Sequence, residues 1–130
     1  MGMSWVEQRK WKELWRRKLK ARYNVIDNGK IIVLGTAQRL VLEYVANDKV
    51  RESEVLNFLG MLGLSYAKSK VIKGLKRRGI VTNDGYYLVL TEYGEHILQK
   101  MRQRYGKINV DLLENALKEH NAEIIDKMCI

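Results

Sequence analysis

The sequence predicts an α+β fold that is mainly helical and contains one small β-hairpin. Several segments repeat their apolar residues every three to four positions, which is the pattern of amphipathic helices. Two others, 80–82 and 86–90, are rich in branched and aromatic residues and flank the turn residues Asn83-Asp84-Gly85, as the strands of a hairpin would. With 130 residues, no proline and a single cysteine, the chain suits one domain without a long linker or a disulfide framework.

The segment from Ser65 to Arg78 is predicted to be a basic amphipathic helix. Ser65 is a suitable N-cap, and Gly79 supplies the left-handed residue that ends a helix. Between Ser65 and Ile80 there are six Lys or Arg residues and no Asp or Glu, whereas an ordinary exposed helix mixes both signs. A face of one sign is typical of a helix that binds a polyanion. The residues expected to face the interior are Ala67, Val71 and Leu75, with Gly74 beside them as a point of close approach.

The hairpin and a further helix are predicted to follow. Because side chains alternate along a strand, the face with Tyr86, Leu88 and Leu90 is expected to cover the core. Thr91 is a suitable N-cap for the next helix, and Gly94 in its first turn would let that helix pack closely against the sheet. The expected core residues of this helix, which would run over 92–105 and end at Gly106, are Ile97, Leu98 and Met101.

Two helices and a short strand are predicted before the basic helix. Thr36 begins a segment with helical apolar spacing, and 49–51 is long enough for one short strand. Ser53 is a candidate N-cap for a helix over 53–59, which a glycine-bearing link, 60–64, joins to the basic helix. The predicted order from Thr36 is therefore helix, strand, helix, helix, strand, strand, helix. The residues expected on the buried face of the first of these helices are Ala37, Leu40, Val41, Tyr44 and Val45.

This order resembles that of the winged helix-turn-helix proteins, most closely the small prokaryotic regulators of the MarR and PadR type. The resemblance covers 36–101, about half of the chain. It rests on SKVIKGLKRRGIV (69–81), where a recognition helix runs into a glycine and a strand, and on YYLVLTEYG (86–94), where a wing strand runs into a threonine-capped helix. The resemblance implies a DNA-binding protein whose basic helix enters the major groove.

The resemblance and the charge pattern together predict which side chains contact DNA. Early and central side chains on the exposed face are expected to reach base edges, and later Lys and Arg residues to hold phosphates. Such wings commonly carry Arg or Lys at the tip, whereas Asp84 stands there in this chain, so Asn83 is expected to contact a phosphate in place of minor-groove insertion. The base-edge candidates are Ser65, Tyr66, Ser69, Lys70 and Lys73, and the phosphate candidates are Lys68, Lys76, Arg77, Arg78 and Asn83.

The net charge of +9 is unevenly distributed along the chain. Residues 1–23 hold eight basic and two acidic side chains, and 65–80 hold six basic and no acidic ones, so the remainder is slightly acidic. Two basic patches on a nearly neutral body are typical of a nucleic-acid-binding protein. Charge alone does not distinguish DNA from RNA as the partner.

The first segment, 5–23, is predicted to be a helix whose three tryptophans need a packing partner. Three interpretations remain open: a dimerisation arm, which we favour, a second contact to the DNA backbone, and a helix lying on a membrane surface. The dimerisation candidates here are Trp5, Trp11, Leu14, Trp15 and Leu19, with Tyr23 at the edge of the stripe. The candidates for a second DNA contact are Arg9, Lys12, Arg16, Arg17 and Lys20.

The segment between this helix and Thr36 contains the turn residues Asp27-Asn28-Gly29. The flanking segments, 23–26 and 30–34, fit either the two strands of a hairpin or a helix end followed by one strand. The pattern does not separate these two interpretations.

A last helix is predicted from Val110 towards Met128. Three of its apolar residues are seven apart with a fourth between the first two, which indicates a short interaction seam. In MarR-like proteins the terminal helices interlock two protomers, so the resemblance implies a homodimer here. The residues of the expected seam are Val110, Leu113, Leu117 and Ile124.

The expected organisation is a single domain, 1–130, with a basic Trp-rich arm and connecting strand (1–35), a winged-helix core (36–101) and a C-terminal dimerisation extension (102–130). No apolar run approaches the roughly 18 to 20 residues that span a bilayer, so we expect a cytoplasmic, nucleoid-associated protein. The predicted function is DNA binding by a dimeric transcription regulator. The alternatives are an architectural, chromatin-type protein that coats DNA with little sequence preference, and a winged helix that binds proteins within transcription or replication machinery.

Catalysis has little support in the sequence. His96 and His120 are far apart and each falls in a helical register, as surface or interface imidazoles would. No paired-carboxylate, metal-ligand or nucleophile motif is present. We therefore predict no enzyme activity, no metal and no cofactor, and no small-molecule effector is indicated.

Overall fold

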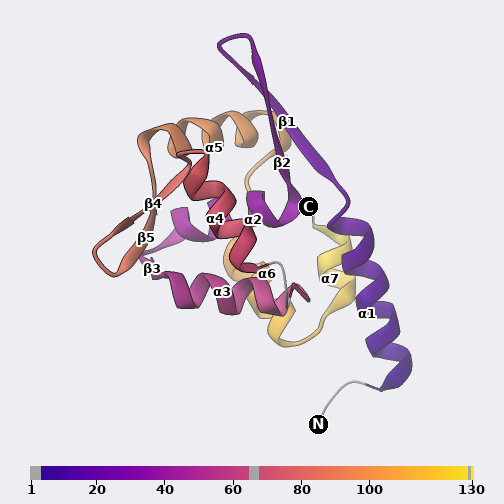
Figure 1. Cartoon of the computed structure of the whole chain (residues 1–130). Helices are drawn as coiled ribbons and strands as arrows, with labels where there is room; N and C mark the ends of the chain where they lie inside the picture. The colour runs from indigo at the N-terminus through magenta and orange to yellow at the C-terminus, as the bar shows by residue number, and fades with distance from the viewer. Residues whose placement is uncertain (1–3, 65–67, 129) are drawn as a thin grey trace.

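The computed structural model of the chain describes residues 4–64, 68–128 and 130, and this part contains seven helices and two antiparallel sheets (Figure 1). The α+β class predicted from the sequence is confirmed, and so is the predicted order of elements from Thr36 to the helix that ends at Tyr105. The elements are α1 (Trp5–Lys18), β1 (Arg22–Asp27), β2 (Lys30–Gly35), α2 (Thr36–Asn47), β3 (Val50–Arg51), α3 (Glu52–Met61), α4 (Lys68–Arg77), β4 (Val81–Asp84), β5 (Tyr87–Leu90), α5 (Glu92–Tyr105), α6 (Val110–Lys118) and α7 (Ala122–Lys127).

The segment before α2 is a hairpin of β1 and β2, which decides between the two interpretations left open above. Its turn residues, Asn28 and Gly29, have positive φ angles of 48° and 78°. A two-residue turn of this kind matches the right-handed twist of the flanking strands. The face that carries Val25 and Leu34 is buried, and the tip projects from the body of the protein (Figure 1).

Side chains of α5 cover the outer edge of β1. The backbone N–H of Asn24 donates to the hydroxyl of Tyr105 at 2.9 Å, and Arg104 donates to the carbonyl oxygen of Asn24 at 2.7 Å. Lys100 donates to the carbonyl oxygen of Ile26 at 2.6 Å. These three hydrogen bonds attach the β1–β2 hairpin to α5 along β1.

The second sheet has the strand order β3-β5-β4. Leu88 of the central strand is fully buried, as predicted. The turn between β4 and β5 lies later than predicted, because Asn83 and Asp84 pair with β5 as part of β4, and the turn is made by Gly85 and Tyr86. Since Tyr86 lies in that turn, it is 84% exposed and does not belong to the core face.

The start of α5 is held as the sequence predicts. The Oγ1 of Thr91 accepts a hydrogen bond from the N–H of Gly94 at 2.9 Å. Gly94 is buried against the chain just before β4, where a Cβ would lie 2.0 Å from the carbonyl oxygen of Ile80. Only glycine fits this contact, so it fixes how α5 sits against the sheet. The predicted core residues Ile97, Leu98 and Met101 are buried, and Gly106 ends the helix with a φ of 87°.

α2 runs through the core and carries two buried charged side chains. Glu43 accepts two hydrogen bonds from Arg102 of α5, at 3.0 and 2.9 Å. The guanidinium of Arg39 lies 4.7 Å from the ring centre of Tyr23 in β1 and 5.5 Å from that of Tyr105 in α5. These contacts join α2 to both neighbours. Of the predicted face, Leu40, Val41 and Val45 are buried, and Ala37 and Tyr44 are half-buried against the core.

The predicted last helix is in fact two helices. α6 and α7 are separated by a turn in which His120 has a φ of 52°, so the prediction of a helical register for His120 is wrong. α6 contacts α2 and α3 of its own chain. The assignment of this seam to a dimer is therefore corrected, because Val110, Leu113 and Leu117 are buried within the protomer and Ile124 is half-buried against the same core.

The first helix is shorter than predicted. α1 ends at Lys18, and Tyr23 belongs to β1. Leu14 and Trp15 are buried in the chain's own core, where α1 contacts α7, so their assignment to a dimer interface is also corrected. Trp11 and Leu19 are half-buried against that core, whereas Trp5 is 73% exposed.

The first turn of α3 also differs from the prediction. Its N-cap is Arg51, and Ser53 lies inside the helix. The side chain of Glu54 accepts a hydrogen bond from the N–H of Arg51 at 3.4 Å, which satisfies the backbone donor of the N-cap residue itself.

Candidate nucleic-acid interface

α4 presents a basic side to solvent, but its rotation differs from the prediction. Ile72 and Leu75 are buried, at 2% and 0% exposure, whereas Val71 and Gly74 are only half-buried. The inward face is therefore turned by roughly a quarter of the helix circumference from the predicted stripe. This rotation buries two large aliphatic side chains, Ile72 and Leu75, which explains why it is preferred to the predicted one. Ala67, the other member of the predicted stripe, lies outside the described residues.

The rotation turns one row of three cations to solvent. Lys70, Lys73 and Arg77 follow one another at intervals of three and four residues, so they share a side of the helix. All three are exposed, and none has an ion-pair or hydrogen-bond partner in the described part of the chain. We call these three residues the α4 row.

Gly74 lies beside this row. The sequence prediction that a neighbouring element approaches it closely is wrong, because a Cβ at Gly74 would meet nothing within 4 Å. The glycine instead leaves the backbone of α4 uncovered on its outer side. A ligand can approach the helix axis more closely there than at any residue with a side chain.

Two of the predicted phosphate contacts have partners within the chain. Nζ of Lys76 lies 2.6 Å from Oε1 of Glu52 in the first turn of α3. Arg78 donates to the carbonyl oxygen of Val33 in β2 at 3.1 Å. Both side chains tie α4 to its neighbours, so a phosphate would have to displace Glu52 or the carbonyl oxygen of Val33 to bind them.

The other predicted DNA contacts are placed in different ways. Ser69 is exposed next to the α4 row, and Asn83 is exposed on β4. Lys68 is half-buried, with its Nζ next to Gly60 near the C-terminal end of α3, where the helix dipole favours a cation. Ser65 and Tyr66 lie outside the described residues.

The second basic patch lies on α1. The residues predicted for a second DNA contact are all exposed, and so is Lys10, which was not among them. The five predicted residues are Arg9, Lys12, Arg16, Arg17 and Lys20. Arg9 lies 3.8 Å from Glu13, and Arg17 lies 3.5 Å from Asp126 of α7. Both pairs are exposed, so each contributes little to stability. Lys10, Lys12, Arg16 and Lys20 have no ion-pair partner among the described residues.

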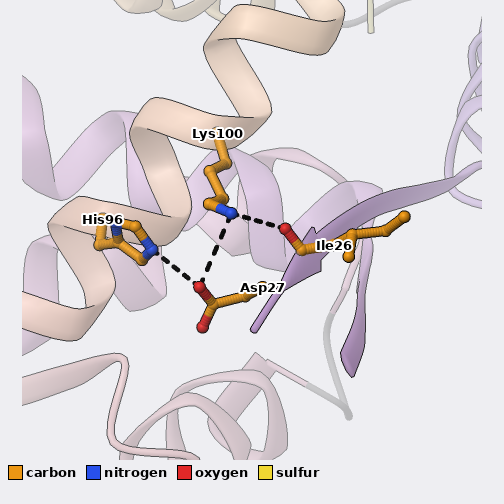
Figure 2. Close-up of polar contacts among 4 residues, drawn as sticks. All are labelled: Ile26, Asp27, His96 and Lys100. Atoms are coloured by element: carbon orange, nitrogen blue, oxygen red, sulfur yellow. Dashed lines mark hydrogen bonds and ion pairs between the residues drawn. The ribbon is translucent and has the colours of Figure 1, made fainter. Parts of the chain in front are cut away.

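His96 takes part in a polar cluster that joins α5 to the β1–β2 hairpin (Figure 2). Its Nε2 lies 2.8 Å from Oδ1 of Asp27, and Nζ of Lys100 lies 3.7 Å from the same oxygen. The hydrogen bond with His96, aided by the charges of His96 and Lys100, holds the pKa of the Asp27 carboxyl below its usual value despite desolvation. His120 is not part of this cluster. Its ring packs against that of Trp11, with 5.2 Å between the ring centres.

Two other kinds of feature are absent from the part of the chain that the structure describes, a metal-binding group of side chains and a membrane-spanning helix. No three His, Cys, Asp or Glu side chains there gather in a way that would hold a metal ion. None of the described helices has the length and apolar character needed to cross a bilayer. No protein-family model matches the chain, and comparison with curated proteins and with solved structures gives no significant match.

Proposed function

We propose that the chain is a DNA-binding protein in which 36–105 forms a winged helix and α4 enters the major groove of a duplex. The order α2-β3-α3-α4-β4-β5-α5 and the three-stranded β3-β5-β4 sheet support the fold. The observation that carries the function is the α4 row, three exposed and unpaired cations on a helix that crosses the molecule between its two hairpins (Figure 1).

The dimensions of the α4 row suit a groove. An α-helix with its side chains is about 10–12 Å across, and the major groove, about 12 Å wide, admits one such helix. In this arrangement Lys70 and Lys73 donate to base edges or to the nearer phosphates, and Arg77 holds a phosphate. Gly74 lets the helix backbone approach the DNA.

The salt dependence of binding follows from the number of free cations. Each phosphate that is neutralised contributes about −0.9 to the slope of log K against log salt. With Lys76 and Arg78 engaged inside the protein, the α4 row predicts a slope of up to about −2.7 per protomer, which is reached when all three of its cations pair with phosphates. Nearly salt-independent binding would contradict the proposal.

The biological role that we propose is transcription regulation by a homodimer. Two copies of α4 would then read half-sites roughly 34 Å apart. Apolar surface for a dimer remains on the hairpin, where Ile26, Ile31 and Val33 are 65%, 70% and 40% exposed.

One observation favours a second candidate, an architectural protein with little sequence preference. The α4 row contains no Asn or Gln, and its single Arg comes late in the helix, so bidentate recognition of bases is limited. Selection of bound fragments from random duplexes separates the two roles. A regulator should prefer its own site by about 10³ or more over bulk DNA and give a two-fold symmetric footprint. An architectural protein should show neither.

The α4 row is tested by Lys70→Ala combined with Lys73→Ala. The matched control is Lys107→Ala combined with Lys127→Ala, which removes the same charge from exposed positions away from α4. Fluorescence anisotropy with a labelled duplex should show weaker binding for the α4 variant, with a salt slope smaller in magnitude by up to about 1.8 per protomer, the full change being expected when both lysines pair with phosphates. The control should bind as the parent protein does. Equal losses in both variants would show that net charge, and not α4, determines binding.

A further inference from the structure

The N-terminal half of α1 extends beyond the body of the protein. The buried residues of this helix, Leu14 and Trp15, lie in its C-terminal half, where α1 contacts α7. Figure 1 shows the first turns of α1 continuing past α7 towards the N-terminus. Trp5, the first residue of the helix, is 73% exposed, and Val6 is 57% exposed.

One side of α1 combines this tryptophan with cations. Trp5, Arg9, Lys12 and Arg16 follow one another at intervals of three and four residues, so they share a face that points away from Leu14. We call these four residues the Trp5 face. The guanidinium of Arg9 lies 5.7 Å from the ring centre of Trp5. Together with Gln8, the first three line a surface hollow of about 410 Å³.

The chemistry of the Trp5 face argues against two kinds of partner. A second copy of the same face would bring like charges together, which is unfavourable. A helix that lies on a membrane needs a continuous apolar stripe facing the lipid, whereas the apolar stripe of α1, Leu14 and Trp15 with Trp11, is turned into the protein. The partner that fits is anionic and offers a flat ring to an exposed indole.

We propose that the Trp5 face binds single-stranded nucleic acid. An unpaired base stacks on the ring of Trp5, and the neighbouring phosphates pair with Arg9, Lys12 and Arg16. The exposed Arg9–Glu13 pair is weak enough to exchange its carboxylate for a phosphate. Single-stranded DNA and RNA share this chemistry. The inference goes beyond duplex binding by α4 and rests on different residues.

The test compares labelled oligothymidylate, oligouridylate and the duplex used for α4, with the full-length chain. Trp5→Ala should weaken single-strand binding about tenfold, while Trp5→Phe, which keeps a ring for stacking, should stay within about threefold of the parent. Val6→Ala is the matched apolar control and should have no effect. Because Trp5 is largely exposed, all three variants should keep the parent's circular dichroism spectrum and melting temperature. The relative affinities for the two oligonucleotides identify DNA or RNA as the better ligand.

Lys12→Ala combined with Arg16→Ala tests the phosphate contacts. This variant should reduce the salt slope for the single strand by about 1.4, since single strands contribute about 0.7 per phosphate. The Lys107→Ala and Lys127→Ala control should leave the slope unchanged.

Specific outcomes would overturn the inference. One is an unchanged single-strand affinity in Trp5→Ala, and another is an equal loss for single strand and duplex. Binding to vesicles that contain anionic lipid, with no binding to either oligonucleotide, would assign the face to a membrane instead. The Lys70→Ala and Lys73→Ala variant separates the two proposals, because it should lose duplex binding and keep single-strand binding. If this variant keeps duplex binding, the role proposed for α4 is contradicted and the role proposed for the Trp5 face is not.

Discussion

The carbonyl oxygen of Ile80 occupies the space in which a side chain at Gly94 would begin, with only 2.0 Å between that oxygen and a Cβ. Gly94→Ala therefore has to displace α5 from the chain that precedes β4. We expect a loss of about 1–3 kcal/mol in the free energy of unfolding, which urea denaturation of the full chain would measure. A loss smaller than about 0.5 kcal/mol would show that α5 does not pack this closely.

The opposite result is expected at Gly74, in the middle of α4. Nothing lies within 4 Å of a Cβ there, and glycine inside a helix is less favourable than alanine. Gly74→Ala should therefore raise the free energy of unfolding by about 0.5–1 kcal/mol. If α4 enters a groove, the same variant should bind duplex DNA more weakly despite being more stable. Higher stability together with unchanged binding would place the DNA away from Gly74.

The buried pair of Glu43 and Arg102 gives a third prediction. The side chain of Glu43 is fully buried, and that of Arg102 is 23% exposed. Arg102→Met leaves an unpaired carboxylate in the core, which should lower the free energy of unfolding by about 3–5 kcal/mol. Adding Glu43→Leu removes that charge and should restore most of the loss. Two losses that simply add would show that the residues do not interact in solution.

A pH dependence follows from Asp27. Its pKa is lowered in the folded protein, chiefly by the hydrogen bond with His96, so the ionised carboxyl stabilises the fold above its unfolded pKa of about 3.9. This contribution is lost as the pH falls through the folded-state pKa. The stability difference between the parent and Asp27→Asn should therefore be present above about pH 4 and shrink in more acidic solution. A difference that stays constant across this range contradicts the assignment, and His96→Ala should reduce the pH dependence.

Features with a local physical cause were predictable from the sequence. The cap at Thr91 and the left-handed residue Gly79, whose φ is 73°, depend on neighbours a few residues away. The same holds for the strand and helix order from Thr36 to Tyr105. The break between α6 and α7 was missed because a histidine, and not a glycine, takes the positive φ. The available signal was Asn121, whose side chain accepts a hydrogen bond from the N–H of Ile124 and caps α7.

The candidate site was predictable only in part. The composition of α4 shows that cations are concentrated there, but not which of them remain free. Lys76 is paired with Glu52, 24 residues away, and Arg78 with the carbonyl oxygen of Val33, 45 residues away. Such contacts depend on tertiary packing. The rotation of α4 also depends on it, because Val71 and Ile72 are similar in character and the surrounding core decides which one turns inward.

The asymmetric attachment of the β1–β2 hairpin has a consequence for amide exchange with heavy water. On the β1 edge, the N–H of Asn24 is held by the hydroxyl of Tyr105, although no further strand lies there. On the β2 edge, the register around the two-residue turn directs the amides of Ile31 and Val33 away from β1, where no further strand pairs with β2. Deuterium should therefore enter at Ile31 and Val33 long before it enters at Asn24, and Tyr105→Phe should abolish that contrast.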